Sequence, residues 1–128
     1  ITVGYHNHQF ELEAHVDGTT GLEVLADLLD PAVVLELDTY WAAVGGADPI
    51  ALLGRLGDRV RLIHVKDGDI SLDTKNQTAV GSGRMPVLDI LAAAPTARRV
   101  VELDDFAGDM FDAVADSASY LTSNGEQL

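Results

Sequence analysis

The chain has 128 residues, of which 47% are hydrophobic and 23% charged, so it carries enough apolar sequence for one folded domain rather than a disordered segment. Its 21 Asp and Glu outweigh 8 Lys and Arg, and the formal net charge of −13 argues against nucleic acid as a partner. No segment has the length and apolar character of a membrane span, and the N-terminus lacks a secretory pattern, so we expect no membrane partner and a cytoplasmic location. There is no cysteine, so any metal must bind His and carboxylate side chains.

Short β-type runs alternate along the chain with segments that have a helical spacing of apolar residues. The strands are predicted at residues 1–6, 33–38, 60–65 and 99–103. The helices are predicted at residues 22–29, 49–56, 87–94 and 110–121. Asp48 before Pro49 marks the start of the second helix, and Pro95 marks the end of the third. This order predicts an α/β fold with parallel strands and crossover helices.

A polar stretch without apolar periodicity, residues 66–83, separates the third strand from the third helix. Connections of this length often serve as lids or binding loops. Residues 80–83 (VGSG) offer backbone N–H groups that would suit a phosphate, although one glycine-rich turn is a weak motif.

Every predicted strand ends in side chains that are able to bind a metal ion. Active sites of parallel α/β folds lie at the carboxyl ends of the strands, so we expect these side chains to converge. Imidazole together with carboxylate suits Mn²⁺, Zn²⁺, Co²⁺ or Fe²⁺, whereas sites made only of oxygen suit Mg²⁺ and Ca²⁺. The ionisable residues at the strand ends are His6, His8, Glu36, Asp38, His64, Lys66, Asp67, Glu102 and Asp104.

Several segments resemble the second half of the sugar phosphate isomerase/epimerase family, which has the xylose-isomerase-like barrel. They are GYHNHQFELE (4–13), LELDTYWAAVGGADP (35–49), RLIHVKD (61–67), VGSG (80–83), VVELDD (100–105) and SASYL (117–121). The resemblance implies that residues 1–128 form a single domain, the C-terminal half of a (β/α)8 TIM barrel whose N-terminal half is absent from this chain. A lone half-barrel exposes two parallel edge strands, so we expect either a missing half-barrel or self-association to cover them.

Members of this family bind one divalent metal through a Glu, an Asp, a His and a second Glu on successive strands. Asp38, His64 and Glu102 match the last three positions, and His6 occupies the first, where many relatives have Glu. The resemblance therefore implies a metal site of these four residues, holding Mn²⁺, Zn²⁺ or Co²⁺, with Mg²⁺ as an alternative. Simpler roles remain open: a substrate contact for His6, a helix cap for Asp38, a core histidine for His64 and an internal ion pair for Glu102.

Four further residues are expected to contact a substrate, namely His8, Glu11, Trp41 and Lys66. His8 shares the strand face of His6. The other three residues each have an alternative role. Glu11 would lie on a solvated edge if QFELE alternates as a strand, and Trp41 would anchor helix packing. Lys66 would neutralise Glu36 inside the barrel.

The activity that the resemblance implies is isomerisation or epimerisation of a sugar or sugar phosphate. Glu102 would remove a proton next to a carbonyl to form an enediolate, with His6 as a second catalytic residue. Because His6 replaces a carboxylate, aldose–ketose isomerisation, or dehydration of a keto-sugar or keto-inositol, fits better than a two-base epimerisation. The net charge argues against the apurinic endonucleases of the same superfamily, and a non-catalytic barrel fragment remains the alternative of another class.

Overall fold

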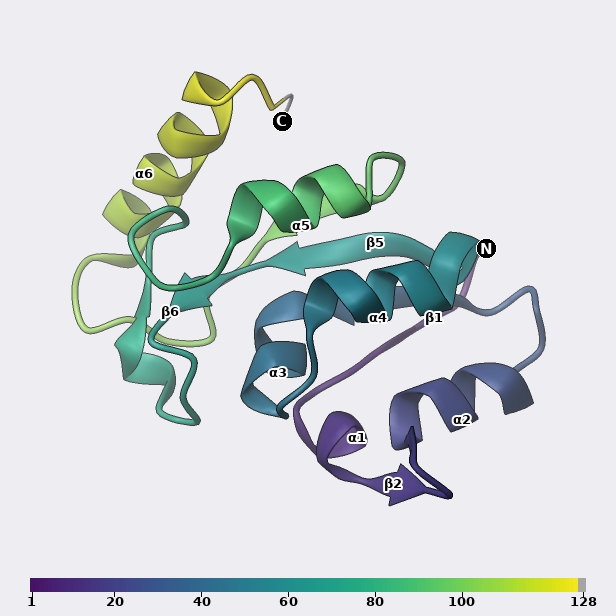
Figure 1. The fold of residues 1–128 in the computed structure, drawn as a ribbon. Coiled ribbons are helices and arrows are strands. Elements are labelled where there is room, and N and C mark those ends of the chain that lie inside the picture. Colours follow the sequence, from purple (N-terminus) through teal and green to yellow (C-terminus); the bar gives the residue numbers. More distant parts are fainter. Residues whose placement is uncertain (127–128) are drawn as a thin grey trace.

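The computed structural model describes residues 1–126 and contains one sheet of four parallel strands with helices packed against it (Figure 1). The strands lie in the order β1 (Gly4–His6), β4 (Val34–Asp38), β5 (Val60–Val65) and β8 (Arg98–Val101). The connections between them contain α2 (Gly21–Leu28), α4 (Pro49–Leu56) and α5 (Val87–Ala93), and α6 (Met110–Ser123) follows β8. The predicted α/β fold with parallel strands is confirmed.

The outer strands are shorter than the sequence predicts. β1 begins at Gly4 rather than at residue 1, because its partner β4 begins at Val34, with which Gly4 is in register. β8 ends at Val101, where its pairing with Val65 ends, so Glu102 lies just beyond the strand. The helices agree more closely: α4 has the predicted bounds, while α5 ends one residue early and α6 extends two residues further.

Two segments form helices that the sequence analysis did not predict. The α1 helix (Phe10–Glu13) occupies the QFELE segment, where strand-like alternation had suggested a solvated edge. It is helical because one side of the turn buries Glu11 and Leu12, and it leads into a small hairpin of β2 (His15–Val16) and β3 (Thr19–Thr20). The α3 helix (Thr39–Val44) follows β4 directly, and the Asp38 side chain caps it.

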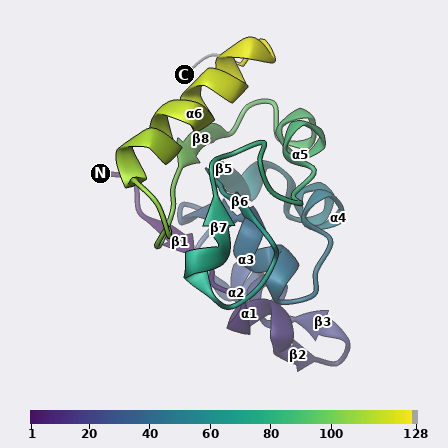
Figure 2. The same ribbon diagram turned by 90° about the vertical axis from the view of Figure 1, so that its left-hand side faces the viewer.

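The polar stretch 66–83 is ordered rather than an open loop. It contains β6 (Asp67–Gly68) and β7 (Gln77–Thr78), which pair antiparallel, with the short 3-10 helix η2 (Thr74–Asn76) between them. A second 3-10 turn, η1 (Gly57–Arg59), joins α4 to β5. Figure 2 shows the β6–β7 pair in front of the central strands, next to the end of the sheet that carries the site described below.

The hydrophobic core lies between the sheet and the helices. Leu35, Leu37 and Ile63 point to this side and are at most 1% exposed. In Figure 2, α4 and α5 lie together on this side of the strands. Each fully buried side chain of this size contributes about 1.5–3 kcal/mol. Because side chains alternate along a strand, the intervening residues Glu36 and His64 point to the opposite face.

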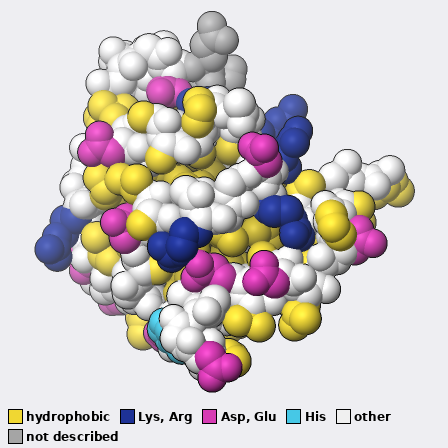
Figure 3. All heavy atoms as spheres, turned by 45° about the vertical axis from the view of Figure 1, so that its right-hand side comes forward, with side chains coloured by type: hydrophobic (Ala, Val, Ile, Leu, Met, Phe, Trp, Pro, Cys, Tyr) yellow, Lys and Arg dark blue, Asp and Glu magenta, His cyan; other side chains and the backbone are white. Residues whose placement is uncertain are grey.

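Charged side chains are dispersed over the surface. On the face drawn in Figure 3, Lys and Arg side chains are separated by acidic and apolar ones and form no continuous basic surface. Within residues 1–126, no helix has both the length and the apolar character needed to cross a membrane.

Candidate active site

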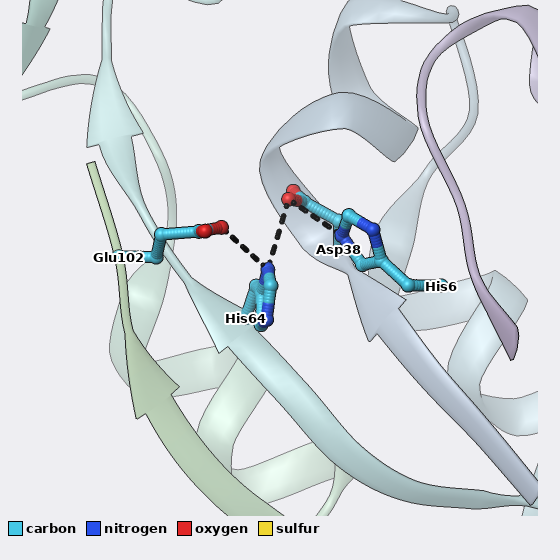
Figure 4. A group of neighbouring side chains, drawn as sticks. All are labelled: His6, Asp38, His64 and Glu102. Atoms are coloured by element: carbon cyan, nitrogen blue, oxygen red, sulfur yellow. Dashed lines mark hydrogen bonds and ion pairs between the residues drawn. The ribbon is translucent and has the colours of Figure 1, made fainter. Parts of the chain in front are cut away.

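The four predicted metal ligands converge at the carboxyl end of the sheet (Figure 4). His6 ends β1, Asp38 ends β4, His64 lies near the end of β5, and Glu102 follows β8. One nitrogen or oxygen atom of each side chain lies within 4.8 Å of those of the other three. The parallel register produces this convergence, because it pairs Asp38 with His64 and brings each strand end to the same edge.

The Asp38 carboxylate divides its oxygens between the fold and the cluster. Oδ1 accepts a hydrogen bond of 2.9 Å from the backbone N–H of Trp41, at the start of α3. Oδ2 lies 3.3 Å from His6 Nε2, 3.4 Å from His64 Nδ1 and 2.9 Å from Lys66 Nζ. Burial alone would raise the pKa of Asp38, but the hydrogen bond with His6, the nearby His64 imidazole and the charge of Lys66 hold it well below its usual range. The carboxylate is therefore ionised.

The His64 imidazole lies among three carboxylates. Its Nε2 is 3.1 Å from Glu36 Oε1, and its Nδ1 is 2.7 Å from Glu102 Oε2. Burial tends to lower the pKa of His64, but the nearby carboxylates of Asp38, Glu102 and Glu36 raise it overall. The Nδ1 atom is fully buried, yet none of its neighbours is aligned to form a hydrogen bond with it.

This arrangement fits a divalent metal ion. A buried imidazole nitrogen without an aligned hydrogen-bond partner, adjacent to two carboxylates, has a free position for a ligand bond. A donor set of two imidazoles and two carboxylates is of the kind that Zn²⁺, Mn²⁺ and Co²⁺ accept.

Glu102 is the most accessible member of the cluster. Its side chain is 40% exposed, whereas that of Asp38 is fully buried. Its Oε2 lies 2.9 Å from Lys66 Nζ and contacts His64. A carboxylate that is held at one oxygen and open to solvent is able to reach a bound small molecule.

Lys66, a predicted substrate contact with an ion pair to Glu36 as the alternative, pairs with carboxylates other than Glu36. Its Nζ contacts Asp38, Glu102 and Asp104 at 2.7–2.9 Å, and His64, not Lys66, is the partner of Glu36. Burial alone would lower the pKa of Lys66, but the three carboxylates outweigh it and raise the pKa. Lys66 is therefore charged, and it is 1% exposed.

Two residues that complete this network were not among the predicted metal, catalytic or substrate-binding residues. Gln77 donates to Asp104 Oδ2 at 2.7 Å, and the Asp104 N–H donates to Gln77 Oε1 at 2.7 Å. Burial would raise the pKa of Asp104, but Lys66 and Gln77 lower it overall. Asp104 was recognisable as an acid two residues beyond Glu102, whereas nothing in the sequence around Gln77 indicates its role.

Asn7 is a third residue that was not assigned a role, although it lies in the HNH strand end. Its side chain accepts a 2.8 Å hydrogen bond from the N–H of Asp38 and donates one of 3.2 Å to the carbonyl of Asp38. This amide continues the pairing of β1 with β4 beyond the last strand residue, and so it fixes His6 next to Asp38.

The remaining predicted substrate contacts differ in accessibility. His8 is exposed, with its ring 5.0 Å from that of His6. Glu11 is buried: it accepts hydrogen bonds from Tyr5 Oη (2.5 Å) and from the His8 N–H (2.9 Å), and its carboxylate raises the pKa of Tyr5 to about 12. A substrate contact by Glu11 would have to displace one of these bonds. Trp41 is 6% exposed, and its ring centroid lies 5.6 Å from Lys66 Nζ.

The two glycine N–H groups of the VGSG turn already have an anionic partner. Asp67, 1% exposed, accepts hydrogen bonds from the N–H groups of Gly81 and Gly83 at 3.0 Å through Oδ2. Its Oδ1 accepts from those of Gly68 and Met85 at 2.8 and 2.9 Å. A Cβ on Gly83 would lie 2.2 Å from Asp67 Oδ1, so glycine is required there. The interpretation of this turn as a phosphate cradle is therefore wrong, because the carboxylate of Asp67 occupies it.

Comparisons with known proteins find relatives over part of the chain. No family model matches the chain. Over 64 residues it is 39% identical to an inosose dehydratase of Geobacillus kaustophilus, a match that covers 49% of this chain and 20% of that enzyme. Over 68 residues it is 34% identical to an inosose dehydratase of Bacillus anthracis, covering 52% and 22%. The matches thus span about a fifth of each enzyme.

Two solved structures are similar over almost the entire chain. Both are described as sugar phosphate isomerase/epimerases from Parabacteroides distasonis. One has a TM-score of 0.72 and 32% identity, covering 94% of this chain and 44% of that one. The other has a TM-score of 0.73 and 27% identity, covering 93% and 44%. The predicted resemblance to the sugar phosphate isomerase/epimerase family is therefore confirmed, and the chain corresponds to less than half of these barrels.

Proposed function

We propose that this chain carries the metal-binding side of the active site of an enzyme that isomerises or epimerises a sugar or sugar phosphate. The observation that supports the proposal is the convergence of His6, Asp38, His64 and Glu102 at the carboxyl end of the parallel strands. Active sites of barrel enzymes lie at this end. Since the chain covers 44% of the solved relatives, the rest of the pocket would come from another half-barrel or a second copy.

The four residues would hold one divalent ion, with Mn²⁺, Zn²⁺ or Co²⁺ suited to the mixed nitrogen and oxygen donors and Mg²⁺ as an alternative. When bound, such an ion would polarise a substrate carbonyl and make the adjacent C–H more acidic. Asp38 and His64 are the buried members and would anchor the site.

Glu102 is the proposed base. Its carboxylate is 40% exposed and lies at the edge of the cluster, where it is able to take the proton from the carbon next to the carbonyl. Returning that proton to the neighbouring carbon completes an aldose–ketose isomerisation. His6, whose side chain is 26% exposed, and the adjacent His8 would contact substrate hydroxyls and exchange their protons.

Dehydration of a keto-sugar or keto-inositol is the second candidate. The 39% identity to an inosose dehydratase over 64 residues favours it. The same proton abstraction by Glu102 would then be followed by loss of a β-hydroxyl, which leaves as water after accepting a proton from His6. Mass spectrometry of the product separates the two reactions, because only dehydration changes the mass of the substrate.

The deciding experiment is exchange of substrate C–H hydrogen in deuterated water, with a panel of aldoses, ketoses, sugar phosphates and keto-inositols. Replacing Glu102 by Gln keeps the shape and removes the basicity, so exchange should slow by roughly 10²–10⁴-fold. Asp105→Asn is the matched control: it removes a nearby carboxylate charge, and Asn retains the oxygen that accepts from the N–H of Phe106. Equal exchange rates for the parent and Glu102→Gln would show that Glu102 is not the base.

The metal site has its own test, which also addresses the non-catalytic alternative. After incubation with Mn²⁺, Zn²⁺ or Co²⁺ and removal of free ions, elemental analysis should find about one ion per site in the parent. His64→Ala should abolish binding. A well-folded parent that retains no ion would favour a non-catalytic barrel fragment.

A further inference from the structure

A fixed positive charge already lies within the proposed metal cluster. Lys66 Nζ is 2.9 Å from Asp38 Oδ2 and 2.9 Å from Glu102 Oε2, which are two of the proposed ligands. Its third partner, Asp104 Oδ2, lies at 2.7 Å and is outside the cluster. The ammonium therefore shares carboxylates with the ion that the cluster would bind.

The surroundings of Lys66 prevent its ammonium group from moving into solvent. The side chain is 1% exposed, and the Trp41 ring lies 5.6 Å from Nζ. Asp104 is itself fixed by the two reciprocal 2.7 Å hydrogen bonds with Gln77, which is 1% exposed. Gln77 belongs to β7, so the ordered polar stretch 66–83 holds the ammonium group in place.

A buried cation at this position has two opposite electrostatic effects. Without a metal ion, it offsets the mutual repulsion of the ligand carboxylates, whose charges interact strongly at low permittivity. With a metal ion present, it repels that ion and competes for the same oxygen atoms. We propose that Lys66 is an internal counter-ion that keeps the metal-free cluster assembled and weakens its affinity for divalent ions, so that the ion is held reversibly. This inference rests on the proposed metal site.

The test is the substitution Lys66→Met, which keeps an unbranched side chain only one atom shorter and removes the charge. Affinity for Zn²⁺ and Mn²⁺ is measured by competition with a chromophoric chelator, and Tm is measured in EDTA and at saturating metal. The variant should bind metal on the order of tenfold more tightly, or better. Its Tm should fall by about 10 °C in EDTA and recover largely with metal, because the divalent ion then replaces the missing charge. A residue that only fills space would lower Tm equally under both conditions.

Lys75→Met is the matched control, since Lys75 is an exposed lysine in η2 of the same polar stretch; its metal affinity should stay within about twofold of the parent. Asp104→Asn should change metal affinity in the opposite direction. It leaves the ammonium less compensated, so metal affinity should fall by about threefold or more, and this result decides the matter if Lys66→Met does not fold. An unchanged affinity in Asp104→Asn would overturn the proposal. A parent that binds no metal would refute the proposed function, whereas a metal-binding parent with no tighter binding in Lys66→Met would refute only the counter-ion role.

Discussion

Replacing Asp67 by Ala tests whether its carboxylate stabilises the ordered polar stretch 66–83, which lies between β5 and α5. Four backbone N–H groups would lose their acceptor. Those of Gly81 and Gly83 belong to exposed residues and are able to bind water, whereas the hydrogen bonds from Gly68 and Met85 are buried. Each stranded buried donor costs about 1–3 kcal/mol, so we expect the free energy of unfolding to fall by about 4 kcal/mol.

The measurement is urea unfolding followed by circular dichroism in EDTA, with thermal unfolding as a second probe. A loss of this size corresponds to a Tm lower by about 15 °C for a domain of this length. Asp69→Ala is the control in the same polar stretch: Asp69 is exposed, accepts a hydrogen bond from Ser71 Oγ, and should change stability by less than about 0.5 kcal/mol. If Asp67→Ala loses less than about 1 kcal/mol, the turn does not depend on this carboxylate and the reasoning is refuted.

In Glu11→Gln, the ultraviolet titration of Tyr5 should move from about 12 toward its ordinary value of about 10, because the hydrogen bond to the Glu11 carboxylate is weakened and its negative charge is lost. In the parent the raised pKa of Tyr5 means that folding stability declines as pH rises from about 10 to about 12, and an unchanged titration in the variant would contradict this coupling. Gly54→Ala, within α4 and facing open space, should add about 0.5–1 kcal/mol in urea unfolding, whereas Gly83→Ala should be strongly destabilising. Sedimentation velocity should show association of the chain, since β1 and β8 are the edges of the sheet, and a monodisperse monomer would count against the half-barrel interpretation.

Local signals in the sequence were sufficient for most of the fold. Asp48 and Pro49 set the start of α4, and the Asp48 side chain caps it by accepting from the N–H groups of Ile50 and Ala51. The strand ends were predictable because His and carboxylates recur where each apolar run stops, and parallel pairing brings such positions together. What these signals did not contain is which side chain meets which.

The errors concern contacts that are distant in sequence. The partner of the VGSG turn is Asp67, whose hydrogen bonds to Gly81 and Gly83 span 14 and 16 residues, so the sequence alone suggested an external anion. Lys66 was expected to contact a substrate or, as the alternative, to neutralise Glu36 inside the barrel. It follows the last residue of β5, and at that height its neighbours are Asp38 and Asp104.

The two oxygens of Asp38 make different interactions. This affects how a related chain that has lost its metal site should be recognised. Because Oδ1 caps α3, a chain that no longer binds metal still benefits from an aspartate here, and its loss would cost about 1 kcal/mol as a missing helix cap alone. Glu102 lies beyond its strand with a 40% exposed side chain, so a chain released from function would lose little by replacing it. Between two related chains, the residue at the position of Glu102 is therefore more diagnostic of retained chemistry than the aspartate.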